Sequence, residues 1–310
     1  MDIEILLVLQ NLRGTLGNCL NDFFAFITTI AVDYYILIPA LILFWAVDKK
    51  AGIVSLASYG VGCFYNAILK STFAVYRPWI RSDKIKPLEA VMKGASGYSF
   101  PSGHSTSVSS FYCALIFYYR KHKKLCAIFV FMILVTMFSR IYVGVHTPQD
   151  VLVGALIGVL AIATVWWVSK FVSNKPNYDV IVLVVGVIVC IIALVYIYTK
   201  EYPMDYVDGK LIVDPVTMTI NGFKDPGIFF GVLLGWFVER RFVKFEICKS
   251  SVKKVERCLI GAILVIFYWT VIADPVGSFF KINIVYFLLK ASIPFIFMVI
   301  YPLLFKPLKL

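Results

Sequence analysis

The sequence predicts an all-α fold, a polytopic membrane helical bundle with about nine transmembrane helices. Of the 310 residues, 60% are hydrophobic and only 15% are charged, whereas soluble domains are about 45–50% apolar and about 25% charged. The mean hydropathy is +0.85. Apolar runs of about 18 residues or more recur along the chain, and each could cross a hydrocarbon core of about 30 Å. These observations exclude an ordinary soluble protein.

The apolar runs alternate with polar connections, and no internal repeat is visible. The predicted spans cover residues 23–47, 51–70, 103–119, 125–143, 150–169, 179–199, 226–243, 258–274 and 284–305. Asp2 and Glu4 occupy the place where a cleavable signal would carry cations. A short helix at the membrane surface is suggested by Ile3, Leu6, Leu7 and Leu9, so residues 1–22 are expected to form an interfacial N-terminal segment.

The distribution of positive charge predicts the orientation. More than half of the 30 Lys and Arg fall in one set of alternating connections, around residues 49–50, 120–124, 170–175, 240–257 and 306–309. Cations of short loops stay in the cytoplasm, which places the N-terminus outside and the C-terminus in the cytoplasm. This placement also explains the net charge of +12 without a nucleic-acid partner.

One predicted outer loop, residues 71–102, is positively charged against this rule. It carries five cations and two acids. The cations are Arg77, Arg81, Lys84, Lys86 and Lys93. Outer loops tolerate some cations, but an anionic substrate would also account for them.

Three polar segments map to the predicted outer ends of the spans. They are Lys70-Ser-Thr-Phe-Ala-Val-Tyr-Arg77-Pro78, Tyr98-Ser-Phe-Pro-Ser-Gly-His104, and Ser139-Arg140-Ile-Tyr-Val-Gly-Val-His146-Thr-Pro-Gln-Asp150. An arginine fork suits two phosphate oxygens, and lysine serves as a point charge. Ser102 and Gly103 begin a predicted helix, where free backbone N–H groups favour an anion. Lys70, Arg77 and Arg140 could therefore surround a phosphate.

Two of the three histidines fall in these segments. Phosphoryl transfer through a covalent intermediate needs a nucleophile and a general acid, and His104 and His146 can fill these roles. Asp150 lies four residues after His146 and could orient its ring. His122, in a cationic loop, is expected to be solvated.

Each residue alone has a simpler interpretation. A single cation could be an interfacial anchor, and Asp150 could stabilise a helix start. Ser102 could cap its helix. A metal site built from two histidines and a carboxylate is a further alternative, but three nearby cations would repel the ion. The combination in fixed order and spacing favours a phosphate site without metal or other cofactor.

These segments resemble the signature of the type 2 phosphatidic acid phosphatase superfamily, K-x6-R-P, P-S-G-H and S-R-x5-H-x3-D, over roughly residues 50–170. The resemblance implies a helical, metal-independent phosphatase-type core, with His146 as the nucleophile that forms a phosphohistidine. His104 would protonate the leaving group, and Asp150 would orient His146. The remaining signature residues, Lys70, Arg77, Ser102, Gly103 and Arg140, would hold the phosphate.

The expected organisation is an interfacial segment (1–22), a catalytic membrane core (23–174) and C-terminal transmembrane helices of unknown role (175–310), which match no motif. The predicted topology is similar to that of glucose-6-phosphatase, which lacks a carboxylate at the position of Asp150. The seven cysteines form no CxxC pair and are expected to be small buried hydrophobes.

The sequence thus predicts a multi-pass phosphatase of a bacterial plasma membrane, with its site on the non-cytoplasmic face. Its expected substrate is a lipid phosphate, either an isoprenoid diphosphate or a phosphatidyl phosphate, within membrane lipids. A lipid phosphotransferase and a lipid scramblase or transporter are the alternatives, and the oligomeric state is open.

Two charges interrupt the apolar runs. Asp33 is expected to pair or cap rather than line a headgroup pocket, and Lys290 weakens the last predicted span.

Overall fold

The computed structural model describes residues 2–31, 34–92, 94–175, 177–207 and 209–308, so Asp33 and Lys93 lie outside it. The described chain is predominantly helical, which confirms the all-α class. Its first half contains α1 (Asp2–Leu16), α2 (Asn18–Thr29), α3 (Tyr34–Ile42) with the π-helical turn η1 (Leu43–Val47), α4 (Lys49–Phe73), α5 (Pro78–Arg81), α6 (Glu89–Met92), α7 (Gly103–Tyr118), α8 (Lys123–Tyr142) and α9 (Pro148–Asn174).

The second half begins with α10 (Tyr178–Thr199) and a short antiparallel hairpin of β1 (Tyr206–Val207) and β2 (Lys210–Leu211). It continues with α11 (Pro215–Val238), η2 (Glu239–Val243), α12 (Ser251–Phe267), η3 (Tyr268–Ala273), α13 (Asp274–Phe280), α14 (Asn283–Phe295), η4 (Ile296–Ile300) and α15 (Tyr301–Leu303).

The expected count of nine spans is not confirmed. Among the described residues, six helical segments are long and apolar enough to cross a membrane, or seven if α2 and α3 with η1, which meet at 60°, form one span. The two further predicted spans correspond to α7 and α11. Helix α7 has 16 residues, short of the roughly 20 that a span needs, and the middle of α11 carries a lysine, an aspartate and a proline.

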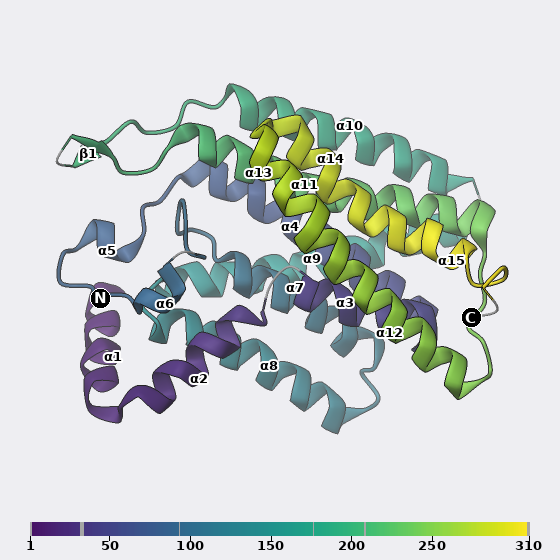
Figure 1. Cartoon of the computed structure of the whole chain (residues 1–310), viewed down its shortest axis with the longest axis horizontal. Helices are drawn as coiled ribbons and strands as arrows, with labels where there is room; N and C mark the ends of the chain where they lie inside the picture. The colour runs from purple at the N-terminus through teal and green to yellow at the C-terminus, as the bar shows by residue number, and fades with distance from the viewer. Residues whose placement is uncertain (1, 32–33, 93, 176, 208, 309–310) are drawn as a thin grey trace.

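The connections gather at two opposite ends of the bundle. Helices α1, α5 and α6 and the hairpin lie at one end, hereafter the site end, and α1 lies across the bundle there (Figure 1). The far end carries the cationic connections and α15. There Lys49 pairs with Glu239 and donates to the Phe245 carbonyl at 2.6 Å. Which end faces the cytoplasm stays a prediction.

Helix α11 begins eleven residues earlier than the predicted span 226–243. The Asp214 carboxylate accepts hydrogen bonds from the Val216 and Thr217 amides, both at 3.1 Å, and Pro215 occupies the first turn. These groups satisfy free N–H donors at the helix start. Pro226 lies inside this helix. Asp225, which directly precedes the predicted span, therefore lies within α11.

Helices α7 and α9 pack at very close range beside the site end. A Cβ atom on Gly154 would lie 2.7 Å from the Ser102 carbonyl oxygen, and one on Gly158 would lie 2.5 Å from Ser109 Cβ. Small residues four apart allow two membrane helices to approach closely. The Gly154–Gly158 pair thus sets the start of α7 directly against α9.

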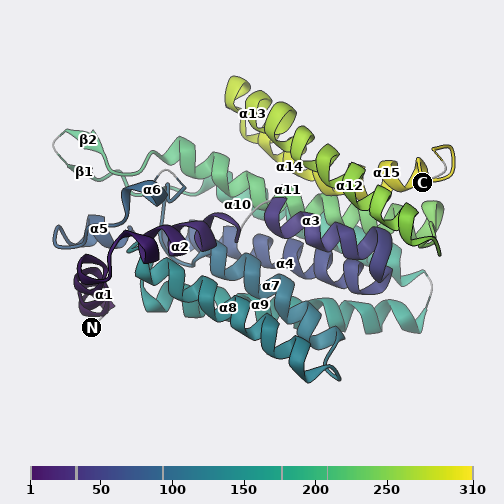
Figure 2. The same ribbon diagram turned by 60° about the horizontal axis from the view of Figure 1, so that its bottom comes forward.

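The C-terminal helices form a layer over α11, on the side away from α8 (Figure 2). Helix α14 packs on α11, where a Cβ atom on Gly231 would collide with the Ala291 carbonyl. Lys290 in α14 pairs with Asp274 at 3.0 Å and lies 3.7 Å from the centre of the Trp269 ring. These contacts explain how the helix accommodates the charge.

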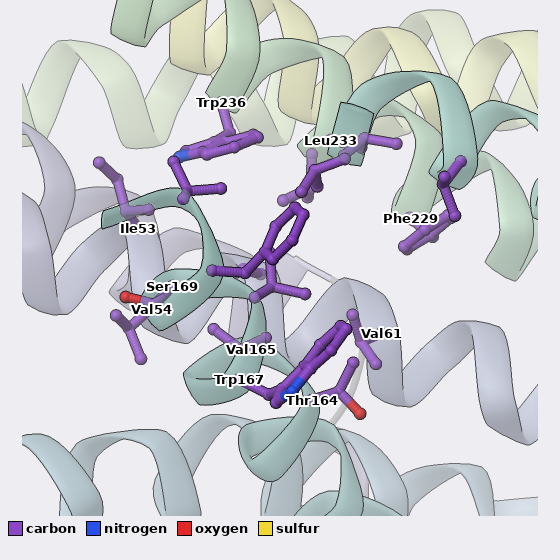
Figure 3. Close-up of a pocket in the computed structure, with 18 of the residues that line it drawn as sticks. Ile53, Val54, Val61, Thr164, Val165, Trp167, Ser169, Phe229, Leu233 and Trp236 are labelled. Carbon is purple, nitrogen blue, oxygen red and sulfur yellow. The ribbon is translucent and has the colours of Figure 1, made fainter. Parts of the chain in front are cut away.

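An apolar cavity of about 440 Å³ lies between α4, α9, α10 and α11 (Figure 3). Val61, Trp167, Phe229 and Leu233 are among its lining residues. None of the expected phosphate-binding or catalytic residues lines it, so it is separate from the candidate active site.

Candidate active site

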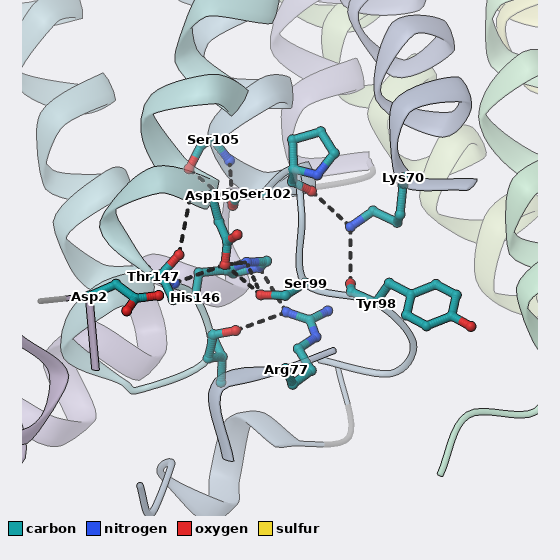
Figure 4. A network of polar contacts seen from close by, with 12 residues as sticks. Asp2, Lys70, Arg77, Tyr98, Ser99, Ser102, Ser105, His146, Thr147 and Asp150 are labelled. Atoms are coloured by element: carbon teal, nitrogen blue, oxygen red, sulfur yellow. Dashed lines mark hydrogen bonds and ion pairs between the residues drawn. The ribbon is translucent and has the colours of Figure 1, made fainter. Parts of the chain in front are cut away.

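The end of α4, the loop before α7 and the turn between α8 and α9 meet at the site end. Arg77 joins the second and third of these segments. Its side chain is buried and donates to the Gly97 carbonyl at 3.1 Å and to the Val145 carbonyl at 3.0 Å. One guanidinium thus fixes two loops that are far apart in sequence. Figure 4 shows this guanidinium beside His146.

The same guanidinium determines the state of the His146 ring. Arg77 Nη1 lies 2.9 Å from His146 Nε2. Because arginine only donates, Nε2 must accept, and the ring proton is assigned to Nδ1. Nδ1 lies 3.4 Å from Asp150 Oδ2. The free lone pair of the ring is therefore on Nε2.

His146 is only 1% exposed. Its turn lies outside the membrane-spanning segments, which end at Tyr142 and resume at Pro148. Burial, followed by the positive charges of Arg77 and Arg140, holds the pKa of His146 well below its ordinary value of 6.5. Both effects disfavour the charged imidazolium, so the ring is neutral near pH 7.

Asp150 is held by the start of α9. Its Oδ2 accepts hydrogen bonds from the Ser99 hydroxyl at 2.5 Å and from the Thr147 amide at 2.8 Å. The Thr147 hydroxyl in turn accepts from the Asp150 amide, which completes a capping box. The carboxylate is thereby fixed beside His146.

Lys70, in the last turn of α4, fixes the loop that leads into α7. Its Nζ donates to the carbonyls of Pro101 at 2.8 Å and Tyr98 at 3.2 Å. One turn earlier, Asn66 Nδ2 donates to the hydroxyl of Thr106 at 2.9 Å. The ammonium group thus positions the loop and brings positive charge to the site.

Ser102 caps α7. Its hydroxyl accepts from the Ser105 amide at 3.4 Å, and its own amide donates to the Asp150 carbonyl at 3.0 Å. The capping interpretation of Ser102 therefore holds in this structure. Gly103 and His104 follow at the helix start and face an open cavity.

This cavity of about 410 Å³ also has Arg140 in its wall. The Arg140 side chain is 2% exposed and its Nη1 donates to the Thr28 hydroxyl at 2.7 Å. Within the described residues, its Nε has no hydrogen-bond partner. A buried donor of this kind is costly, and a bound anion would satisfy it.

The predicted site residues therefore fall into two adjoining groups. Lys70, Arg77, Ser102, His146 and Asp150 belong to the hydrogen-bonded network or its supporting loop. Gly103, His104 and Arg140 line the cavity, and His104 is close enough to His146 and Arg140 to interact with them electrostatically.

Sequence reasoning missed four residues of the site. Ser99 supports Asp150, Asn66 supports the loop, and Thr147 completes the cap. Asp225 of α11 lines the cavity. The Thr147-x-x-Asp150 spacing is a capping signal that could have identified Thr147, whereas Ser99 and Asp225 are joined to the site only by tertiary packing.

The arrangement suits a tetrahedral anion. Three cationic side chains and a helix start supply positive potential, and a neutral imidazole supplies a lone pair. Within the described residues, no group of three or more His, Cys, Asp and Glu is arranged to hold a metal ion. His146 Nε2 faces a guanidinium, a neighbour that would repel a divalent cation.

Two protein-family models match the parts of the chain that contain the site residues. The model of the PAP2 superfamily matches residues 51–174, and that of the PAP2 superfamily phosphatase, transmembrane extension, matches residues 223–310. The second match gives a family assignment to much of the segment in which the sequence alone showed no motif. No solved structure matches the chain.

Several curated proteins are similar to the chain. Undecaprenyl-diphosphatase of Sulfolobus acidocaldarius is 31% identical over 140 residues, which cover 45% of this chain and 66% of the relative. Phosphatidylglycerophosphatase B of Bacillus subtilis is 32% identical over 117 residues, 35% of this chain and 53% of the relative. Lipid A 4'-phosphatase of Bacteroides thetaiotaomicron is 28% identical over 112 residues, 36% of this chain and 48% of the relative.

The chain thus spans about half to two thirds of the length of these relatives. Its two family matches and its apolar helices agree with a multi-pass membrane protein. Because both family models match, and because the chain carries the three-part signature described above, it belongs to the PAP2 superfamily and has the transmembrane extension of its phosphatases.

Proposed function

We propose that this protein is a metal-independent membrane phosphatase that hydrolyses a lipid phosphate or diphosphate through a phosphohistidine on His146. The observation that carries the proposal is the state of His146. Its Nε2 is an acceptor 2.9 Å from Arg77, and its other nitrogen faces Asp150. The names of the three relatives support a lipid phosphate as the substrate class.

In the first half-reaction, substrate phosphate binds between Arg77, Arg140 and the start of α7. An oxygen of the phosphate takes over the hydrogen bond that Arg77 Nη1 makes to His146, which frees the Nε2 lone pair. Nε2 attacks phosphorus in line, the P–N bond forms and the ester P–O bond breaks. His104 donates a proton to the departing oxygen.

In the second half-reaction, water enters the place of the leaving group. His104 accepts a proton from this water as it attacks phosphorus, and the P–N bond breaks with its electron pair returning to His146. Inorganic phosphate leaves, and both imidazoles regain their starting states. Asp150 stabilises the Nδ1 proton throughout, and the cations offset the charge on the transferring phosphoryl group.

The position of the site favours an amphiphilic substrate. It lies at one end of the helical bundle, where a headgroup can enter while the lipid tail stays in the hydrocarbon layer. Because cations of short loops stay in the cytoplasm, we expect the cationic far end to face the cytoplasm and the site to open on the non-cytoplasmic face of a plasma membrane. An isoprenoid diphosphate and a phosphatidyl phosphate both satisfy this geometry.

Phosphate release by the purified protein in detergent tests the proposal. The substrates are undecaprenyl diphosphate, phosphatidylglycerophosphate, phosphatidic acid and glucose 6-phosphate, each with EDTA present. We expect lipid hydrolysis that EDTA does not abolish and that His146→Ala eliminates. The matched control is His122→Ala, because His122 is exposed in the loop at the far end. Normal activity in His146→Ala, or full inhibition by EDTA, would contradict the proposal.

A further inference from the structure

Asp225 brings a carboxylate to the active-site cavity from outside the catalytic segment. It lies in α11, within the transmembrane extension, and lines the same cavity as His104 and Arg140. It attracts the Lys70 ammonium group electrostatically. The proposed mechanism does not use this carboxylate, although an acid beside a phosphate site opposes phosphate binding unless it contacts another part of the substrate.

The geometry of attack identifies that part. His146 is buried beneath the site and is not among the residues that line the cavity. In-line displacement places the leaving group opposite the nucleophile. The cavity, which contains the proposed general acid His104, therefore receives the leaving group. Gly103 and Arg140, which hold the transferred phosphoryl group in the proposed mechanism, line the same cavity, so Asp225 shares the cavity with both parts of the substrate.

A carboxylate discriminates strongly between two kinds of leaving group. The departing group of a diphosphate is itself a phosphate, and its negative charge would be repelled by Asp225. The departing oxygen of a monoester instead becomes the hydroxyl of an alcohol and carries no charge. If that alcohol carries a second hydroxyl near the ester, the carboxylate can accept a charge-assisted hydrogen bond from it.

We propose that Asp225 is a specificity-determining residue that accepts a hydrogen bond from a hydroxyl of the leaving group. It selects hydroxylated phosphate monoesters, such as a glycerol phosphate headgroup, over diphosphates. The inference rests on the proposed phosphatase function and narrows its substrate class. A purely structural role of Asp225 would differ from this one. In that case Asp225 would only balance the charge of Lys70, and its substitution would lower kcat/KM for all substrates equally.

Steady-state kinetics of purified Asp225→Asn and Asp225→Ala proteins test this inference. Phosphatidylglycerophosphate has a free hydroxyl beside its phosphate ester, phosphatidic acid has none, and undecaprenyl diphosphate has an anionic leaving group. In Asp225→Ala, kcat/KM for phosphatidylglycerophosphate relative to phosphatidic acid should fall roughly 10- to 100-fold. In both variants, kcat/KM for the diphosphate relative to phosphatidic acid should rise by about tenfold.

Asp274→Asn is the matched control, because Asp274 is an acid of the same extension that pairs with Lys290 outside the cavity. Its substrate ratios should equal those of the wild type. Equal losses on all three substrates in the Asp225 variants, or a wild-type preference for the diphosphate, would overturn the inference and leave the phosphatase function standing. A wild-type protein that hydrolyses none of the three would contradict the phosphatase function itself.

Discussion

The substitution Asp150→Asn perturbs the link between the carboxylate and the nucleophile with little change in volume. In the proposed mechanism, the carboxylate keeps the proton on His146 Nδ1 and leaves Nε2 free to attack. An asparagine amide can instead donate to Nδ1, which would move the ring proton to Nε2. In that tautomer the nucleophilic lone pair is lost and Arg77 faces an N–H group. The variant is therefore expected to bind substrate and to react slowly.

The structure sets the size of the effect. The same exchange in a Ser-His-Asp triad costs about 10⁴ in kcat. Here the Oδ2–Nδ1 distance is 3.4 Å, which is long for a hydrogen bond, so we expect a smaller loss of about 10²–10³. This loss corresponds to about 3–4 kcal/mol of transition-state stabilisation. The capping contact to Thr147 also weakens, at a cost of about 1 kcal/mol of folding stability.

The assay is kcat for phosphate release from phosphatidic acid, with thermal unfolding in detergent measured on the same samples. Ser99→Ala is the matched control, since it removes a donor to the same oxygen and keeps the charge of the carboxylate. We expect its kcat to fall only about tenfold. If Asp150→Asn retains more than about a tenth of kcat while folded, or if Ser99→Ala loses as much, the orienting role of Asp150 is wrong.

Three further predictions concern the rest of the site. Arg140→Ala should lose about 10²–10³ in kcat and keep a trace of activity, whereas Arg120→Ala, at the exposed far end, should match the wild type; equal kinetics of the two variants would remove Arg140 from the site. Because burial and nearby cations lower the pKa of His146, the nucleophile stays unprotonated as pH falls through 6.5. The acid limb of kcat/KM, corrected for substrate ionisation, should therefore lie well below pH 6.5, and a limb centred at or above 6.5 would refute the assignment. Gly158→Val should lower the free energy of unfolding by about 1–3 kcal/mol, since its Cβ would lie 2.5 Å from Ser109 Cβ; Val159→Leu, on an exposed position of α9, should not.

The sequence was most informative where a short stretch of residues carries the signal by itself, as in an apolar run or a motif of fixed spacing. The apolar runs identified the helical class because each run must satisfy its backbone groups internally. The spacing of Arg77, His104 and His146 predicted a phosphate site, because these residue types have few other uses together at a membrane edge. The roles of these residues remain predictions, whereas their placement at one end of the bundle is a feature of the structure.

Other features depend on contacts between distant segments and could not be read from the sequence. The predicted span 226–243 followed the apolar run, whereas α11 begins at Pro215 and includes the polar residues that precede this run. Ser99 contacts Asp150 only because Arg77 and Lys70 fix the loop before α7. Asp225 enters the cavity only through the packing of α11 on α4.

The central claim is that His146 carries the phosphoryl group during turnover. Rapid acid-free quenching of the protein with ³²P-labelled phosphatidic acid, followed by peptide mapping, measures this directly. We predict an acid-labile, base-stable label on the peptide that contains His146, and no label in His146→Ala. Label on another residue, or turnover in His146→Ala at the wild-type rate, would contradict the account.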